Sequence, residues 1–582
     1  MFKRLALAVT ALAVVVAAQA PDNAALQSKL RAQEAAHSQI MEILHQISDV
    51  HGPRLTGSPG LKAADDWAVA TMTSWGLANA HLEGWNFGHP GWSNSLVEAN
   101  VLAPYQAPLD VRPLAWAPGT QGPVTAPAVL LAVPGLHAAA GRRGSAEEQA
   151  AAQAGSDPPP MPAAQPAAPQ PTLAELDAYL DTMRDKVRGA IVLAGAPVHV
   201  DEVFFPAPLR TPDDRWRARF GGPTAASGGG RGGFGGRGRG GAAPDPSRLT
   251  PDQVDFRVTQ FLAANGAVAR VNDAGEAYGI IRAQDVSGYN EAPQVTGLLM
   301  SHQDYARLAR VLADGTAAQV RINVENHFYP NGTTAYNAVG EIRGSDKADE
   351  VVMLGGHYDS WAGSTGATDN GAGSAIMLEA IRLLKAAGVQ PRRTIRVALW
   401  SGEEEGLLGS TAYVEQHFGT AEHPKPEWSK LDAYLNIDSG TGKPRGAGVF
   451  GPPQAAAFIG DALAGFKDWG FFGATASRSR APGGTDSTSF NHAGLPGIGL
   501  SQDRFDYGTY THHTNFDSYE RLFEPDLREA AVEAAAAAYA LAMAPDMLPR
   551  FPASAMPPIQ DGAPWPARLQ GYTQRAQEMP HP

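Results

Sequence analysis

The sequence predicts an α/β protein in which a mixed, largely parallel sheet is flanked by helices. Beyond Tyr336, the segments "EVVMLGGH", "TIRVALW", "LDAYLNID" and "LPGIGLS" are short and almost continuously apolar, which is typical of strands buried on both faces. Between the first two lies "AGSAIMLEAIRLLKAAG", which has the length and apolar spacing of a helix. Strands that alternate with helices indicate a parallel sheet covered on both sides.

The region before this sheet predicts helices followed by short strands. Residues 24–50 carry apolar side chains at helical spacing, namely Ile40, Ile43, Leu44 and Ile47. The turn-rich run "HGPRLTGSPG" leads into a second predicted helix from Leu61 to Trp75, and "HLEGWNF" and "SLVEANVLAP" predict strands. In the middle of the chain, "RGAIVLAGA" predicts a strand and "FLAANGAVARVNDAG" a helix followed by a strand.

Two runs of low complexity interrupt the middle region. Residues 138–172 are rich in Ala, Pro and Gln, and residues 223–248 are rich in Gly. Such runs bury too little apolar surface to fold, so we expect both to be disordered. Within the Gly-rich run, "GGGRGGFGGRGRGG" contains three arginines around Phe234, a composition that can bind RNA. A net charge of −13 favours a surface insertion instead, and we expect no nucleic-acid partner.

The N-terminus predicts export. A basic pair, Lys3 and Arg4, precedes an apolar run to Ala18 and the small-residue ending "AQA", which is the plan of a secretory signal peptide over residues 1–20. The apolar run is shorter than the roughly 20 residues of a membrane-spanning helix. We therefore expect a periplasmic or extracellular protein without a stable membrane anchor. The 582 residues include no cysteine, so any metal must be held by histidines and carboxylates.

Histidines and carboxylates gather where the predicted strands end. Ligands of parallel sheets collect beyond the carboxyl ends of the strands, so these side chains should share one edge of the sheet. The candidates are His357 and Asp359 after "VVMLGG", Asp369 in "GATDNGAGS", Glu403 to Glu405 after "TIRVALW", Asp438 at the end of "AYLNID", and His512 and His513 in "YTHHTNFDSY".

This set has the composition of a two-metal site. Two histidines and three carboxylates from this set suit two zinc ions that share one bridging carboxylate, although manganese or cobalt would also fit, and spacing alone leaves open whether His512 or His513 is the ligand. Two metals can polarise a carbonyl and activate a water, and a carboxylate that binds no metal can take the proton of that water. Taken singly, each residue has a plainer explanation, such as a solvated charge cluster or a helix cap. Their coincidence at one edge favours the site.

The motifs of this edge resemble those of the co-catalytic zinc exopeptidases. "GGHYDSW", "GATDNGAGS", "SGEEEGLLGS", "LNIDSG" and "HHTNFDSYE" occur in the order found in leucyl aminopeptidases, glutamate carboxypeptidase II and carboxypeptidase Q. "GPRLTGS", "PRRTIRVALW" and "GGTDSTSFNHAGLPG" most resemble the carboxypeptidase Q type, and the resemblance runs from about residue 38 to 545 outside the two low-complexity runs. "EEEGLLGS" is more similar to the aminopeptidases and glutamate carboxypeptidase II, which leaves the recognised end of the substrate open.

The resemblance implies a role for each ligand. His357 and Asp438 would hold one zinc, Glu404 and His513 the other, and Asp369 would bridge the two. Glu403 would be the general base, and Glu405 would be solvated or structural. Asp359 would orient His357 and so belongs to the catalytic set. The remaining implied features are a cis peptide at Asp369–Asn370, and His512, Thr485 and Asp486 at the substrate.

The resemblance also implies how the chain is divided. A discontinuous zinc exopeptidase domain would comprise residues 21–115 and 326–546, interrupted by a β-rich protease-associated domain over residues 116–325 and followed by a Pro-rich tail, residues 547–582. The expected protein is an exported di-zinc exopeptidase that acts on dipeptides or short peptides as an aminopeptidase, carboxypeptidase or dipeptidase, with homodimer formation implied by the same likeness. The alternatives are a non-catalytic receptor-like homologue and a single-zinc glutaminyl cyclase-like enzyme.

Overall fold

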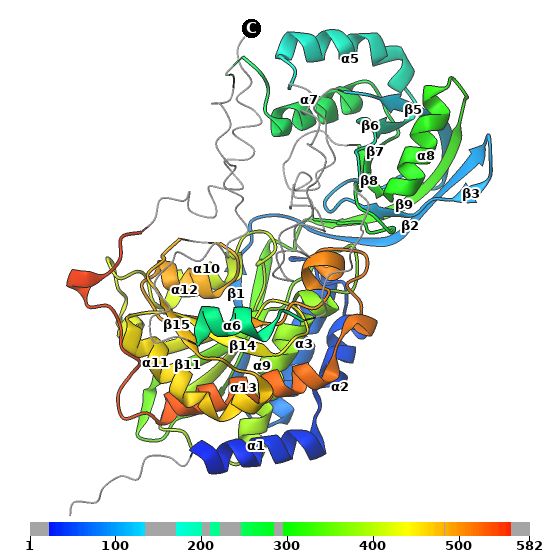
Figure 1. The fold of residues 1–582 in the computed structure, drawn as a ribbon. Coiled ribbons are helices and arrows are strands. Elements are labelled where there is room, and N and C mark those ends of the chain that lie inside the picture. The colour runs from blue at the N-terminus through cyan, green and yellow to red at the C-terminus, as the bar shows by residue number, and fades with distance from the viewer. Residues whose placement is uncertain are drawn as a thin grey trace, which may run out of the picture.

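The computed structural model describes residues 23–133, 170–200, 210–221, 245, 247–284, 295–481 and 483–559. The expected signal peptide, residues 1–20, lies outside the described residues, as do most of the runs 138–172 and 223–248 and the end of the tail. Among the described residues, the strands form two sheets of eight, each at the centre of its own lobe (Figure 1).

The sheet of the first lobe is mixed and has a parallel centre, as the sequence predicts. β12, β11, β13 and β16 are neighbours and run parallel. β10 runs antiparallel to β12, and β14 runs antiparallel to β16. The order across the sheet is β1 (Ala78–Asn86), β10 (Thr334–Ile342), β12 (Arg393–Trp400), β11 (Lys347–His357), β13 (Leu431–Asn436), β16 (Gly497–Gln502), β14 (Pro444–Phe450) and β15 (Ala474–Ser477).

Alternate side chains of the central strands enter two different cores. In β11, Val352 and Leu354 pack into the larger core, and Met353 packs into the other, because successive residues of a strand point to opposite faces. The larger core contains α1 (Asn23–His37), α2 (Ile40–Leu44), α3 (Pro59–Ser74), α9 (Ala372–Ala386), α11 (Pro453–Ala462) and α13 (Glu524–Met543). The other core contains α10 (Leu408–His417) and α12 (Ser487–His492).

The predicted helix over residues 24–50 is divided into three pieces. α1 and α2 are followed by a short helical turn, η1 (His45–Val50), and the predicted stripe is buried from Ile40 to Ile47. The other short helical turns are η3 (Ala367–Gly371), η4 (Pro426–Ser429), η5 (Ala464–Trp469), η6 (Tyr507–Thr511), η7 (Tyr519–Arg521) and η8 (Ala553–Ala555).

The second lobe is itself an α/β unit. β5, β6, β7 and β8 run parallel, with α5 (Leu173–Val187) and α7 (Pro251–Ala264) on one face and α8 (His302–Ala313) on the other (Figure 1). The order across its sheet is β3 (Ala107–Pro108), β2 (Gly91–Ala103), β9 (Gln319–Tyr329), β5 (Val124–Leu131), β6 (Ile191–Ala194), β7 (Ala269–Asp273), β8 (Thr296–Met300) and β4 (Val111–Pro113).

The second lobe differs from the sequence expectation in two respects. It includes β2, β3 and β4, so the second sheet begins at Gly91 and not near residue 116. It also contains the helices α5, α7 and α8. Local sequence could not place the boundary, because β2 pairs with β9, whose residues lie more than 200 positions away along the chain.

α6 (Asp213–Phe220) belongs to the middle of the sequence but packs on the first lobe (Figure 1). Trp216 donates a 3.0 Å hydrogen bond to Asp503, and the ring of Phe220 lies over Gly446 of β14. None of the helices in the described ranges combines the length and apolar character that crossing a membrane requires.

Candidate metal centre

The predicted ligands come together at one edge of the first sheet. The carboxyl ends of β12, β11, β13 and β16 meet there, because these strands are parallel neighbours. His357 is the last residue of β11, and Asp438 lies two residues beyond β13. The other candidates follow neighbouring elements, with Asp369 in η3 ahead of α9, Glu403 to Glu405 after β12, and His512 and His513 after η6.

His357, Asp369 and Asp438 form one group. Nε2 of His357 lies 3.4 Å from Oδ1 of Asp369 and 3.5 Å from Oδ1 of Asp438. One ligand atom from each residue lies within 4.8 Å of the other two, which is close enough to share a metal ion. Oε2 of Glu403 is 3.9 Å from the same Nε2, so this carboxylate stands at the border of the group.

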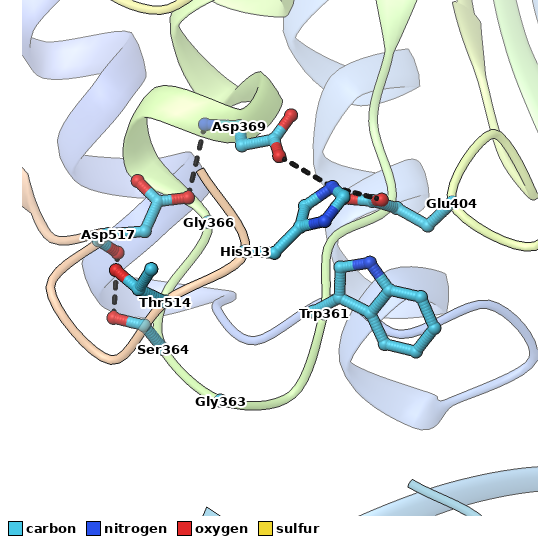
Figure 2. Close-up of a pocket in the computed structure, with 9 residues that line it drawn as sticks. All are labelled: Trp361, Gly363, Ser364, Gly366, Asp369, Glu404, His513, Thr514 and Asp517. Carbon is cyan, nitrogen blue, oxygen red and sulfur yellow. Dashed lines mark hydrogen bonds and ion pairs between the residues drawn. The ribbon is translucent and has the colours of Figure 1, made fainter. Parts of the chain in front are cut away.

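Asp369 also belongs to a second group. Its other oxygen, Oδ2, lies 3.1 Å from Nε2 of His513 and 3.7 Å from Nε2 of His512. Nε2 of His513 is also 2.9 Å from Oε2 of Glu404. The two histidine rings are stacked, with centroids 3.6 Å apart, so both approach the site, but His513 makes the shorter contacts. Figure 2 shows the His513 ring between the carboxylates of Asp369 and Glu404.

The site concentrates negative charge in a buried place. Burial raises the pKa of Glu403 and of Glu404 well above the usual range, and neighbouring carboxylates raise both further. Burial lowers the pKa of His357, but Glu403 and Asp438 raise it by more, so that it lies well above its ordinary value. Oε1 of Glu404 is buried without a hydrogen-bond donor among the described residues. Divalent cations would balance these charges, and the nitrogen and oxygen donors fit zinc.

The loop that carries Asp369 is held from several sides. The peptide bond between Asp369 and Asn370 is cis, as expected. The side chain of Asn370 donates to the carbonyl of Ile437 over 2.9 Å and accepts from the N–H of Gly373 over 3.0 Å. A Cβ at Gly373 would come within 2.3 Å of Asn370 and 2.5 Å of Ile437, so only glycine fits there. These contacts fix Asp369 between the two groups.

Asp359 contacts both His357 and the loop that carries Glu403 and Glu404. Nδ1 of His357 lies 3.1 Å from the carbonyl oxygen of Asp359 and 3.6 Å from its carboxylate. The same carboxylate accepts 3.2 Å hydrogen bonds from the backbone N–H groups of Glu403 and Glu404. Glu405 is only 1% exposed, so the solvated alternative for this residue is wrong and the structural one remains.

Three buried residues contact the site in roles that the sequence did not predict. The hydroxyl of Tyr507 bonds to Asp369 over 2.8 Å and lies 3.3 Å from Asp438. The carboxylate of Asp517 accepts the backbone N–H groups of Thr368 and Asp369. Arg54, wholly buried in the quoted "GPRLTGS" motif, donates to backbone carbonyls that include that of Gly366. Their roles depend on tertiary contacts.

A pocket of about 200 Å³ opens beside the second group (Figure 2). Its lining residues are Trp361, Gly363, Ser364, Gly366, Asp369, Glu404, His513, Thr514 and Asp517. Thr485 and Asp486, expected at the substrate, are outside this lining. Thr485 instead accepts a 2.8 Å hydrogen bond from Asn436. Asp486 is 0% exposed, and burial raises its pKa to about 7.

The chain is similar to known peptidases over this region. The family described as Peptidase family M28 matches residues 337–539. Carboxypeptidase Q of Mus musculus is 31% identical over 301 residues, which are 51% of this chain and 61% of that protein. Carboxypeptidase Q of Rattus norvegicus is 32% identical over 258 residues, which are 44% of this chain and 52% of that protein. The matched stretches thus span about half of each relative.

A solved structure supports the fold. The Peptidase M28 precursor from Shewanella amazonensis superposes with a TM-score of 0.57 at 23% identity, over 91% of this chain and 99% of that one. At this identity the likeness concerns the fold alone. The mixed α/β architecture is therefore shared along most of the chain, whereas the matched family segment lies wholly within the first lobe.

Proposed function

We propose, from the match of residues 337–539 to Peptidase family M28, that the chain is an exported zinc-dependent exopeptidase of dipeptides or short peptides. The observation that carries this proposal is the position of Asp369. Its two oxygens lie 3.4 Å from His357 and 3.1 Å from His513. A carboxylate shared in this way between two ligand groups suits a pair of zinc ions.

In this proposal each side chain has one task. His357 and Asp438 would hold one ion, Glu404 and His513 would hold the other, and Asp369 would contribute an oxygen to each. Two bound zinc ions would polarise the scissile carbonyl and lower the pKa of the attacking water.

Glu403 accepts the proton of that water and passes it to the leaving amine. Asp359 keeps this base in place, because its carboxylate accepts the backbone N–H of Glu403 over 3.2 Å. Manganese or cobalt would be held by the same donors.

The pocket favours recognition of a free amine. Its lining includes the acidic residues Asp369, Glu404 and Asp517 and contains neither Lys nor Arg. A substrate carboxylate would be expected to meet a cationic side chain, preferably an arginine that binds both oxygens. We therefore propose that the pocket receives one terminal residue with a free amine.

One dipeptide in three forms tests the reaction and the recognised end. The free, N-acetylated and C-amidated forms are compared, each with and without chelator. Loss on acetylation alone supports the aminopeptidase, loss on amidation alone makes the enzyme a carboxypeptidase, and loss on both makes it a strict dipeptidase. No cleavage of any form after zinc is restored would contradict the catalytic proposal. A metal content of two ions per chain separates it from a single-zinc cyclase.

The second lobe is proposed to act as a protease-associated domain that covers the site. The support is that Arg112, from β4, donates a 3.2 Å hydrogen bond to the carbonyl of Gly363 in the pocket lining. Export and homodimer formation complete the proposal. N-terminal sequencing of the mature protein tests the cleavage near residue 20, and analytical ultracentrifugation tests the dimer.

A further inference from the structure

A short segment of the second lobe reaches the metal centre. Residues 279–284, called the arm below, follow β7 and leave the second sheet for the first lobe. The arm runs antiparallel to the segment that contains the site histidines, with Arg282 opposite Thr514. This pairing is outside both sheets. It brings residues about 230 positions apart into contact.

The arm is fixed by several hydrogen bonds. The N–H of Ala283 donates to the carbonyl of His513 over 2.9 Å, and the N–H of Asn515 donates to the carbonyl of Ile281 over 3.0 Å. The side chain of Asn515 accepts from the N–H of Ile281 over 2.8 Å and donates to the carbonyl of Gly279 over 3.0 Å. Backbone and side-chain hydrogen bonds thus join the arm to the segment that contains His513 and Asn515.

Packing supports the same placement. Ile281 is 0% exposed and Ala283 is 6% exposed. A Cβ at Gly363 would lie 2.7 Å from the Cβ of Ala283, so the arm packs closely on the loop that lines the pocket. Arg282 donates to the carbonyl of His512 and is held from the other side by Glu276 at 3.2 Å. The backbone of both histidines is therefore bonded to the arm.

The arm ends on the ring of His513. Nδ1 of His513 is hydrogen-bonded to the carboxamide oxygen Oε1 of Gln284. A carboxamide oxygen can only accept, so the proton of the neutral ring lies on Nδ1 and the lone pair lies on Nε2. Nε2 is the atom that faces Asp369 and Glu404. His513 also has a φ of +63°, a left-handed conformation that a non-glycine residue keeps only when its surroundings hold it.

We propose that Gln284 is a positioning residue of the metal centre, supplied by the second lobe, which fixes the tautomer and orientation of His513 for zinc. The proposal rests on the proposed function and deepens it, because the second lobe then completes the zinc site as well as covering it. Partners of this kind on metal-bound imidazoles are worth about 10- to 100-fold in metal affinity.

Zinc affinity, measured by competition with a chromophoric chelator, tests the proposal without relying on turnover. Gln284→Leu removes the acceptor and should weaken zinc binding about 10- to 100-fold. Gln284→Glu keeps an acceptor and should restore binding to near the wild-type value. Gln319→Ala, an exposed glutamine at the start of β9, is the matched control. Should the Leu variant fail to fold without metal, Gln284→Ala takes its place.

The outcomes distinguish the positioning role of Gln284 from the proposed function. Wild-type affinity in Gln284→Leu, or equal weakening in the Leu and Glu variants, would overturn the positioning role while leaving the zinc site intact. Failure of the wild-type chain to bind zinc would instead overturn the proposed function, and the inference with it. Weak binding in Leu with recovery in Glu supports the inference.

Discussion

The hydroxyl of Tyr507 donates a 2.8 Å hydrogen bond to Oδ1 of Asp369, the carboxylate that stands between the two histidine groups. The same hydroxyl lies 3.3 Å from Oδ1 of Asp438. Tyr507 is 4% exposed, so the bond is shielded from water. A buried donor aimed at a bridging carboxylate limits its rotation, which suits a ligand that must present each oxygen to a different partner.

Tyr507→Phe removes this donor and keeps the ring packed against His512. We expect zinc affinity to fall by about 10-fold, because outer partners of metal ligands typically contribute 10- to 100-fold. Chelator competition measures the change. Tyr510→Phe, in the same helical turn, is the matched control. Unchanged zinc affinity in Tyr507→Phe would show that Asp369 is held by its own loop alone.

The candidate ligands could be predicted because parallel strands bring distant sequence positions to one edge. His357, Asp438 and the glutamates follow strands that are recognisable as continuous apolar runs, and the edge of a parallel sheet is where ligands collect. The strand pattern therefore carried three-dimensional information. One of the groups of ligand atoms that the structure brings together consists of His357, Asp369 and Asp438, and the other contains Asp369 with His512 and His513.

The residues that support the ligands could not be predicted in the same way. Tyr507, Arg54 and Gln284 act through contacts between segments far apart in the sequence, and no local period marks such contacts. The resemblance implies that Asp486 lies at the substrate, whereas tertiary packing in the structure buries it completely. The edge of the second lobe was missed for the same reason, since β2 finds its partner across the whole lobe.

Adjacent glutamates should respond differently to the same substitution. Glu403→Gln should retain zinc but lower kcat by about 10²- to 10⁴-fold, because a general base typically contributes this much. Glu404→Gln should instead lower zinc occupancy, because its carboxylate faces Nε2 of His513 at 2.9 Å. Metal analysis and kcat, measured on the same preparations, separate the two effects. Near-normal kcat in Glu403→Gln would remove it from the role of base.

Arg54 should be required for the stability of the first lobe. Its guanidinium bonds to the carbonyls of Tyr358 at 2.6 Å and of Ile47, Thr365 and Gly366 at 2.9 Å each. Arg54→Lys cannot reach all four, and orphaned buried groups cost about 1–3 kcal/mol each. We expect the free energy of unfolding to fall by about 3 kcal/mol, as measured by urea denaturation.

The matched control for this substitution is Arg31→Lys. Arg31 pairs with Asp468 on the surface at 2.8 Å, and exposed pairs contribute only about 0–1 kcal/mol. A loss in Arg54→Lys no larger than that in Arg31→Lys would mean that water or a shift of the loop satisfies the freed carbonyls.

Glu34 should make stability depend on pH at a place remote from the metal centre. Burial and, to a smaller extent, the neighbouring Glu379 raise the pKa of Glu34 to about 8, against the opposing effects of Ser38 and Arg528. The folded state therefore keeps a proton that the unfolded state releases above the ordinary value of 4.5. The contribution of Glu34 to the free energy of unfolding is fully present below pH 4.5. It declines as the pH rises to about 8, by at most ~1.4 kcal/mol per pH unit.

Glu34→Gln should remove this decline, because the carboxamide imitates the protonated carboxyl at every pH. Urea denaturation of metal-free protein between pH 5 and pH 8.5 measures it, and effects of the distant ligand site cancel between wild type and variant. We expect similar stability near pH 5 and a growing advantage for Glu34→Gln as the pH rises, which levels off above pH 8. Glu42→Gln, an exposed glutamate on α2, is the control. A constant difference between Glu34→Gln and wild type at all pH values would mean that Glu34 is ionised in the folded protein and balanced by Arg528.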